Sequence, residues 1–362
     1  MIEQAATFSP DWVSPPGDTI LDLLEERGWK QSEFAQRIGF TTKHVNHLIS
    51  GKSAITEDAA IKLERVLGSN ARFWMSREVQ YREALAREGA LEALEAEVEW
   101  LKEVPVANMV KFQWIPKCKR KAEQVAELLK FFGVASVESW RSKYAEPLAA
   151  FRASERLSKK PGAVAAWLRQ GERSASKIRT APFDKAAFKS VLDDLRNLTN
   201  EPDPDIFMPA LVEACASAGV AVVFEPVPTG CPASGVTKWI GTDKALLMLS
   251  FRHSSNDHLW FSFFHEAGHL LLHGKKMLFI ETKELDGEHE EQANQFAGHL
   301  LIPKQFEERL MLLDQSPATI KKFSKEVGVA PGIIVGRMQK DGILPWATKL
   351  NGLKVRYHWR LD

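Results

Sequence analysis

The chain has 362 residues, of which 44% are hydrophobic and 26% are charged, and its formal net charge is +1. At roughly 100–200 residues per domain, this length predicts two or three domains with enough apolar surface to bury a core. The balanced charge excludes a strongly basic or acidic protein, so only a local basic surface could bind nucleic acid.

The N-terminus and the cysteines indicate a cytoplasmic protein. The first residues, MIEQAATFSPDW, lack the basic segment and apolar run of a signal peptide. No apolar stretch approaches the roughly 20 residues that span a bilayer, so no membrane partner is expected. Cys118, Cys215 and Cys231 lie far apart and form no CxxC pair. We therefore predict reduced thiols rather than a cysteine zinc cluster or a disulfide framework.

Five helices are predicted in the first 90 residues. Asp18 is a typical N-cap before an apolar pattern that ends at Gly28. The predicted helices cover residues 18–27, 31–38, 42–50, 56–67 and 72–87. Two short helices separated by a turn at Gly39 are the arrangement of a helix-turn-helix DNA-binding module.

The third predicted helix presents polar side chains that suit the major groove of DNA. The candidate DNA-contacting residues are Gln31, Thr42, Lys43, His44, Asn46, His47 and Lys52. Between residues 29 and 55 there are four basic residues and one acidic residue, a local charge of +3. Residues 1–90 together hold 11 basic and 13 acidic residues, so positive charge concentrates in this module. A small protein-interaction module is the alternative.

Residues 50–81 carry the most specific signal of this region. The run SGKSAITEDAAIKLERVLGSNARFWMSREVQY resembles the lambda-repressor-like helix-turn-helix (XRE family) of HigA-type antitoxins, except that Glu78 and Val79 replace the usual Leu-Gln. The resemblance implies a domain that binds double-stranded DNA. By analogy, the fifth helix would support a homodimer on a palindromic operator, while a toxin partner remains an open question.

The pattern changes from helical to mixed near residue 205. Residues 91–205 are helical in pattern and carry no motif for chemistry, so we predict a helical linker domain that transmits a signal. The stretch NEPDPDIFMP, residues 200–209, has three prolines and three acids, which is typical of a linker or long loop. Beyond it, residues 220–224 and 245–249 are short apolar runs that predict strands.

An HExxH motif lies in the segment WFSFFHEAGHLLLHG, residues 260–274. On a helix, residues four apart share one face, about 6 Å apart along the axis, so His265 and His269 can bind one metal ion. Glu266 can then act as general base on water held by that ion. The motif also occurs by chance, but these polar side chains would be costly inside so apolar a helix without a metal partner.

A third metal ligand is expected on the next helix. His273 lies about 12 Å along the first helix from His265, too far to share the ion easily, so it is interpreted as structural. The metzincin spacing, with its third histidine downstream, is absent. In the segment EHEEQANQFAGHLLIP, residues 288–303, Glu290 is the preferred ligand. The alternatives are Glu288, Glu291 and, more weakly, His289.

Together these segments resemble the ImmA/IrrE family of zinc metallopeptidases, over roughly residues 235–346. In that family the acidic residue four before the Asn or Asp of the second helix completes the metal site, which corresponds to Glu290 before Asn294. The position two after it is often acidic but is Gln292 here. The resemblance implies a Zn²⁺ cofactor and, near GVTKWIGTDKALLMLSFR (residues 235–252), a strand that binds substrate peptide in extended form.

The oxyanion of the transition state needs a second electrophile beside the metal ion. The sequence offers five candidates and does not choose between them: Arg252, His253, His258, His299 and Tyr357.

The sequence therefore predicts a mainly α fold with a small β-sheet (α+β). Its predicted domains are a five-helix DNA-binding domain (1–90), a helical linker domain (91–205) and a gluzincin-like metallopeptidase domain (206–362). The preferred function is a transcriptional regulator fused to a zinc endopeptidase that cleaves a helix-turn-helix repressor, in trans or of its own kind. One alternative is a non-enzymatic HigA-like repressor or antitoxin with a structural or sensory metal site, which would not need Glu266. Another is an antitoxin that neutralises a toxin by binding alone.

Overall fold

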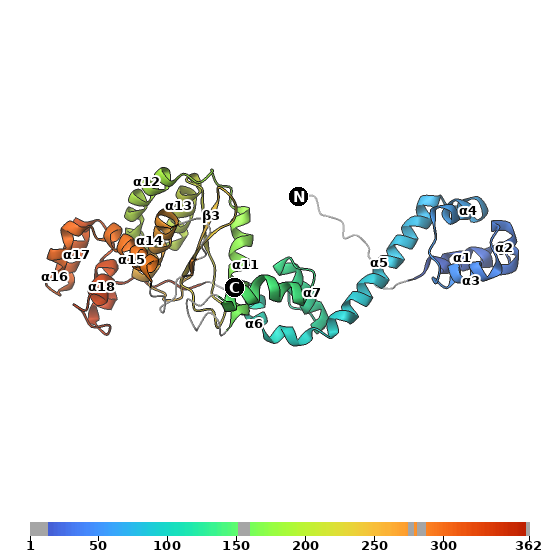
Figure 1. Cartoon of the computed structure of the whole chain (residues 1–362), viewed down its shortest axis with the longest axis horizontal. Coiled ribbons are helices and arrows are strands. Elements are labelled where there is room, and N and C mark those ends of the chain that lie inside the picture. The colour runs from blue at the N-terminus through green and yellow to red at the C-terminus, as the bar shows by residue number, and fades with distance from the viewer. Residues whose placement is uncertain (1–13, 151–159, 274–278, 281–286, 360–362) are drawn as a thin grey trace. The chain divides into compact units, whose positions relative to one another are not determined.

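The computed structural model describes residues 14–150, 160–273, 279–280 and 287–359 (Figure 1). The chain divides into two compact units, Met1–Glu97 and Val98–Asp362. Both are mainly helical, and the second holds a small sheet, so the predicted fold class is confirmed. The predictions for the N-terminal arm before residue 14 and for residues 151–159 of the helical region lie outside the described residues.

The first unit is a five-helix domain, as predicted. Its helices are α1 (Pro16–Glu26), α2 (Gln31–Ile38), α3 (Thr42–Ile49), α4 (Glu57–Leu67) and α5 (Ala71–Glu95). The N-cap residues of α3, α4 and α5 are Thr41, Thr56 and Asn70. Their side-chain oxygens accept hydrogen bonds from backbone amides in the first helical turn. Helix α5 continues well beyond its predicted end at residue 87.

The start of α1 differs from the prediction that Asp18 is its N-cap. Pro15 is the N-cap and Pro16 is the first helical residue. The fixed φ of proline suits this position, and its missing N–H costs nothing because the first amides of a helix have no partner within the helix. Asp18 lies in that first turn, where its charge favours the helix dipole. A Cβ at Gly17 would clash with the backbone of Ile49, so glycine allows α1 and α3 to approach closely.

In the second unit, seven α-helices precede the sheet in the described sequence. They are α6 (Val106–Lys111), α7 (Lys121–Phe132), α8 (Val137–Trp140), α9 (Glu146–Ala150), α11 (Pro161–Lys177), α12 (Lys185–Leu195) and α13 (Pro204–Ser217). The first of these helices enclose an aromatic core, in which the rings of Trp100 and Phe132 lie 5.2 and 5.7 Å from that of Trp140. Trp100 and Trp140 are therefore core residues.

Helix α13 begins inside the stretch that was predicted to be a linker, and the prediction is wrong for residues 204–209. Asp203 caps the helix by accepting a hydrogen bond from the amide of Asp205 at 3.0 Å. Pro204 takes the first helical position, where proline is well tolerated. The Asp-Pro pair that suggested a loop is thus a helix start.

In the described part of the chain the sheet has four strands, in the order β1-β3-β2-β4. They are β1 (Val220–Phe224), β2 (Gly235–Trp239), β3 (Ala245–Leu249) and β4 (Phe279–Ile280). Strand β3 is parallel to β1 and antiparallel to β2, and β2 pairs with β4 through Val236 and Thr237. The two predicted strands are confirmed with the predicted bounds.

Helices cover both faces of this sheet (Figure 1). Leu247 and Leu249 share a core with α14 (Asn256–Leu272), while the intervening Met248 lies against Gly171 of α11 on the opposite face. This burial on both sides explains why β3 reads as a continuous apolar run rather than an alternating one.

The C-terminal segment consists of α15 (Glu288–Leu301), α16 (Glu307–Met311), α17 (Pro317–Val327) and α18 (Pro331–Lys340). Beyond α18, the Lys354 ammonium forms a buried ion pair at 2.6 Å with Asp257 in the first turn of α14. The side chain of Asn256 accepts a hydrogen bond from the Val355 amide. These contacts hold the start of α14 in place. No described helix has the length and apolar character needed to cross a membrane.

Candidate metal centre

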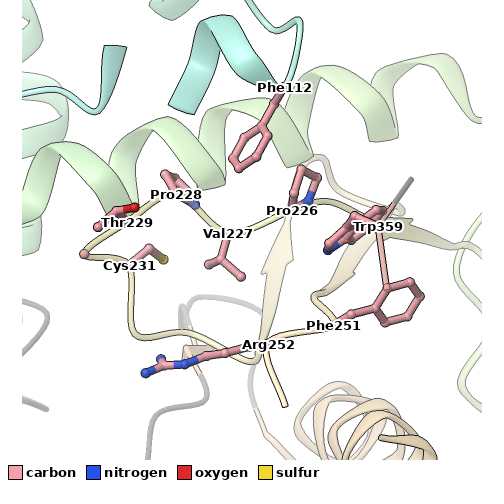
Figure 2. Close-up of a pocket in the computed structure, with 10 residues that line it drawn as sticks. Phe112, Pro226, Val227, Pro228, Thr229, Cys231, Phe251, Arg252 and Trp359 are labelled. Carbon is pink, nitrogen blue, oxygen red and sulfur yellow. The ribbon is translucent and has the colours of Figure 1, made fainter. Parts of the chain in front are cut away.

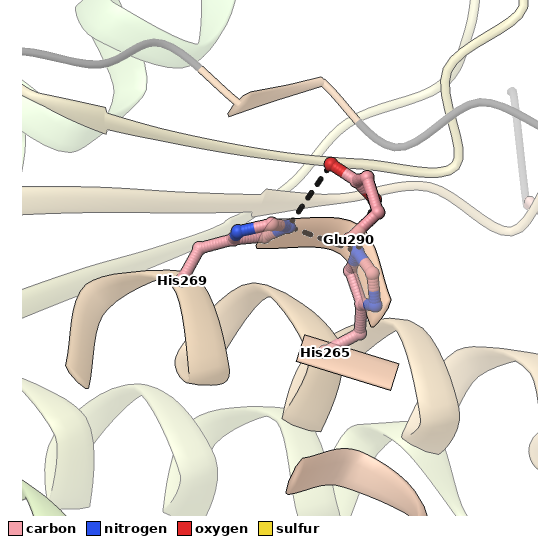
Figure 3. Close-up of side chains that lie close together, drawn as sticks. All are labelled: His265, His269 and Glu290. Atoms are coloured by element: carbon pink, nitrogen blue, oxygen red, sulfur yellow. Dashed lines mark hydrogen bonds and ion pairs between the residues drawn. The ribbon is translucent and has the colours of Figure 1, made fainter. Parts of the chain in front are cut away.

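Helix α14 brings both histidines and the glutamate of the HExxH motif into the interior. His265 and His269 are each 2% exposed, and Glu266 is fully buried. One helical turn separates the two histidines, and their Nε2 atoms lie 3.0 Å apart. Figure 3 shows these rings converging on one point with Glu290. Two imidazoles thus direct the same nitrogen to a shared position.

Helix α15 supplies the carboxylate at that position. The Glu290 oxygens lie 3.2 Å from His265 Nε2 and 3.4 Å from His269 Nε2. One ligand atom from each residue fits within a group no wider than 4.8 Å. The other candidates point elsewhere: Glu288 and Glu291 each accept a hydrogen bond from a glutamine one turn on. The geometry therefore brings Glu290, and neither of those carboxylates, to the histidines.

The two helices approach closely because of Gly268. A Cβ at this position would lie 3.1 Å from the Phe296 ring and 3.4 Å from the Cα of Ala293. Ala293 and Ala297 of α15 are themselves fully buried small residues. A larger side chain at Gly268 would push α15, and with it Glu290, away from the histidines.

Hydrogen bonds on the far side of each imidazole fix its orientation. Asn294 Oδ1 lies 3.0 Å from His265 Nδ1, and an amide oxygen can only accept, so this nitrogen carries the proton. His269 Nδ1 lies 2.9 Å from His273 Nδ1. With its Nδ1 protonated, His265 presents the lone pair of Nε2 to the shared position, as a metal ligand requires.

The protonation states also suit a metal centre. Burial raises the pKa of the Glu290 carboxyl, whereas hydrogen bonds and charges from His265 and His269 in their protonated forms would lower it. Burial lowers the pKa of His269 despite the opposing effect of Glu290. Neutral imidazoles and an ionised carboxylate are the ligand forms of these groups. Two nitrogens and one carboxylate form a donor set that fits catalytic zinc, which keeps a fourth position open.

Strand β2 contacts the glutamate of the motif directly. Thr237 is 2% exposed, and its hydroxyl donates to Glu266 Oε2. The same Oγ1 lies 3.2 Å from the backbone oxygen of Glu266. The strand therefore holds the carboxylate beside the metal ligands. Sequence reasoning missed Thr237, because alternation along a strand assigns a face but does not reveal which helical residue that face meets.

The five oxyanion candidates lie in different environments. Tyr357 is 3% exposed and its hydroxyl has no hydrogen-bond partner among the described residues. His299 lies 3.6 Å from Glu307. His253 and His258, with ring centroids 4.6 Å apart, line a small cavity together with Ser262. Positions 258, 262 and 266 follow one stripe of α14, so this cavity lies along the same face as Glu266.

Arg252, the remaining candidate, lines a different and larger cavity of about 330 Å³ (Figure 2). Its guanidinium donates to the backbone oxygen of Pro232. Loop residues 226–231, Phe112 and Trp359 complete much of the wall, and no metal-ligand candidate lines it. Cavity size therefore does not mark the metal centre in this chain.

In the first unit, helix α3 carries most of the candidate DNA contacts. Thr42, Lys43, Asn46 and Lys52 are exposed, and Gln31, His44 and His47 are partly buried. The partial burial of His44 comes from an edge-to-face contact with Phe40, with ring centroids 4.7 Å apart. Val45 and Leu48 face the core. Thr42, Lys43 and Asn46 thus lie on the outer side of the helix, and Lys52 lies beyond its end.

Two family models match the chain. The model of the IrrE N-terminal-like domain matches residues 215–338, which include His265, Glu266, His269 and Glu290. A helix-turn-helix model matches residues 20–74. The chain carries a helix-turn-helix domain and an IrrE-like domain. In this IrrE-like domain the metal-ligand candidates lie on two consecutive helices, α14 and α15.

Three known proteins are each similar to part of the chain. An uncharacterized HTH-type transcriptional regulator of Escherichia coli, YddM, is 36% identical over 61 residues, which are 17% of this chain. The chain spans 65% of the length of that curated relative. Two solved structures also match, each with a TM-score of 0.22.

The first of these structures is described as an antidote protein of a plasmid maintenance system from Nostoc punctiforme. It is 29% identical, and the match covers 23% of this chain and 94% of that one. The second is an addiction module antidote protein of the HigA family from Coxiella burnetii. It is 22% identical, and the match covers 24% of this chain and 94% of that one.

Proposed function

We propose that this protein is a DNA-binding transcriptional regulator with its own zinc-dependent endopeptidase. The observation that carries the proposal is the convergence of His265, His269 and Glu290, with Glu266 buried one residue from the first ligand. A structural zinc site needs no carboxylate beyond its ligands, so Glu266 favours a catalytic site.

The three ligands would hold Zn²⁺, which when bound supplies a Lewis acid for the peptide carbonyl and acidifies water. The Glu266 carboxylate accepts the proton of the attacking water and later delivers it to the amine that leaves. The hydrogen bond from Thr237 orients this carboxylate.

A substrate peptide would bind in extended form along β2. This strand contacts Glu266 through Thr237, so a peptide beside it would pass the catalytic carboxylate. Strand β4 pairs with β2 at Val236 and Thr237. A peptide would therefore replace β4 at these residues or pair beyond them at Lys238 and Trp239.

For the DNA-binding domain we propose that α3 enters the major groove of a palindromic operator. Exposed donors on its outer side and a local charge of +3 between residues 29 and 55 support this role. Binding as a homodimer would match the two-fold symmetry of such a site. The protein substrate is proposed to be a helix-turn-helix repressor, because a peptidase fused to such a domain is brought to the same promoters.

The substitution Glu266→Gln tests the proposal. It removes the base and leaves the three ligands intact, so zinc content should equal that of the wild type. Both zinc-loaded proteins are incubated with a peptide library made from a digested proteome, and new termini are identified by mass spectrometry. We expect cleavage by the wild type and a loss of at least a hundredfold in the variant, because a general base contributes about 10²–10⁴-fold.

Equal cleavage by both proteins, or none by the wild type with zinc bound, would contradict the peptidase. If the zinc-loaded wild type cleaves nothing but zinc removal still changes operator binding, the result supports a non-enzymatic regulator. Such a result would identify a sensory metal site in a repressor or antitoxin.

A further inference from the structure

We propose that His273, Gln292 and Glu288 form a hydrogen-bond chain that holds the metal ligand His269 in the tautomer and orientation needed for binding. The three residues act as positioning residues and set the affinity of the centre for its metal ion. This inference rests on the proposed metal centre and adds to it the side chains that sustain one of its ligands.

The chain runs from the buried ligand to the surface in three steps. His269 Nδ1 lies 2.9 Å from His273 Nδ1, and His273 Nε2 lies 3.1 Å from Gln292 Oε1. Gln292 Nε2 donates to Glu288 Oε1 at 3.1 Å. His269 lies on α14 and His273 caps the end of that helix, whereas Gln292 and Glu288 lie on α15. The contacts therefore also join the two helices that carry the metal ligands.

The acceptor at the outer end determines the direction of every bond. An ionised carboxylate can only accept, so Glu288 requires the amide nitrogen of Gln292 as donor. The Gln292 oxygen is then turned to His273, whose Nε2 must carry a proton. His273 Nδ1 is left as an acceptor for the proton on His269 Nδ1. His269 Nε2 therefore keeps its lone pair and faces His265 Nε2 and Glu290.

A neutral side chain at position 292 suits this arrangement. The first turn of α15 already holds Glu288, Glu290 and Glu291. A fourth carboxylate at position 292 would lie one turn from Glu288, and like charges at this spacing destabilise a helix. Gln292 links Glu288 to His273 through two hydrogen bonds and adds no charge. The chain thus replaces the direct carboxylate partner that commonly orients a metal-binding histidine.

The residue pair Gln295 and Glu291 offers a matched control. Gln295 Nε2 donates to Glu291 Oε1 at 2.9 Å, the same type of bond one turn apart on the same helix. All four side chains lie on exposed positions of α15. Gln292→Leu and Gln295→Leu therefore remove equivalent surface hydrogen bonds, and Gln292→Leu alone also breaks the contact with His273.

The test measures the zinc dissociation constant of the full chain by competition with a chromophoric chelator. Loss of such an outer partner commonly weakens metal binding by about 10–100-fold. We expect about tenfold for Gln292→Leu, because water competes at this exposed position, and less than about twofold for Gln295→Leu. Gln292→Glu, which keeps an acceptor for His273, should restore binding to within about threefold of the wild type. The thermal midpoints of the zinc-free Gln292→Leu and Gln295→Leu variants should be similar.

Equal affinity in Gln292→Leu and Gln295→Leu would overturn the proposed chain while leaving the metal centre intact. So would a failure of Gln292→Glu to improve on Gln292→Leu. A wild-type chain that binds no zinc would overturn both the chain and the centre. The affinities therefore separate the two failures without any measurement of peptide cleavage.

Discussion

At the scale of single residues, burial separates the side chains that serve the metal centre from those that only fill the core. Glu266 and Thr237 are both buried, and the Thr237 hydroxyl donates to Glu266 Oε2, which holds this carboxylate beside the metal ligands. Tyr357 is equally buried, but its hydroxyl has no partner among the described residues. An unpaired buried hydroxyl costs stability rather than adding it.

We therefore expect Tyr357→Phe to leave peptide cleavage unchanged and to affect stability chiefly at alkaline pH. Burial, with a further contribution from the charge of Glu201, raises the pKa of Tyr357 to about 12 from an ordinary value of 10.0. Because the folded pKa is the higher one, the stability linked to this group is complete below pH 10 and is lost as the pH rises towards 12. The full loss is roughly 2–3 kcal/mol.

Urea unfolding at pH 7 and at high pH measures this effect. The phenylalanine variant should equal or exceed the wild type at neutral pH, because it removes an unpaired hydroxyl and keeps the ring. It should also lose less stability than the wild type between about pH 10 and 12. An identical alkaline loss in both proteins would show that the Tyr357 ionisation is not coupled to unfolding.

At the scale of elements, the metal centre depends on how closely α14 and α15 approach. Gly268 makes that approach possible, since a Cβ there would press on Phe296 and Ala293. We expect Gly268→Val to force the helices apart, at a cost of about 1–3 kcal/mol. Because Glu290 lies on α15, zinc affinity should fall at least tenfold, as measured by chelator competition.

A glycine on the other helix provides the control. A Cβ at Gly298 would meet only the guanidinium of Arg337, at 3.2 Å, and this flexible side chain can move. Gly298→Ala should therefore retain wild-type zinc affinity. If Gly268→Val also retains it, close packing at this glycine does not position the carboxylate.

Local patterns in the sequence were enough to predict the elements that carry the chemistry. The strands at residues 220–224 and 245–249 and the five helices of the first unit follow from apolar spacing and capping residues. The His265 and His269 pair follows from the helical repeat. Glu290 was preferred on the segment itself with Glu288 and Glu291 as alternatives, and the family resemblance then supported the same residue.

Contacts between distant segments could not be predicted in this way. The meeting of Thr237 with Glu266 depends on the register of a strand against a helix, which no local pattern encodes. The helix at residues 204–217 was missed because prolines were interpreted as loop residues, although Pro204 behind Asp203 is a normal helix start. Tertiary packing decided the first case, whereas the second depends on a local capping pattern that was misinterpreted.

At the scale of the whole molecule, the chain consists of two compact units, and the proposed DNA contacts and metal ligands fall in different ones. We expect the double substitution Lys43→Ala and His44→Ala to weaken operator binding by about 2–6 kcal/mol, since each lost base contact costs about 1–3 kcal/mol. Zinc content should remain that of the wild type. Electrophoretic mobility shifts and elemental analysis measure the two properties on the same preparation, and a loss of zinc would contradict independent sites.

The most direct test of the account is the zinc content of the purified chain, measured by elemental mass spectrometry for the wild type, Glu290→Ala and Glu291→Ala. Adjacent glutamates on α15 make the two variants a matched pair, because only Glu290 contacts His265 and His269. We predict about one zinc ion per chain in the wild type and in Glu291→Ala, and a large loss in Glu290→Ala. A zinc-free wild type, or full zinc retention in Glu290→Ala, would contradict the proposed centre.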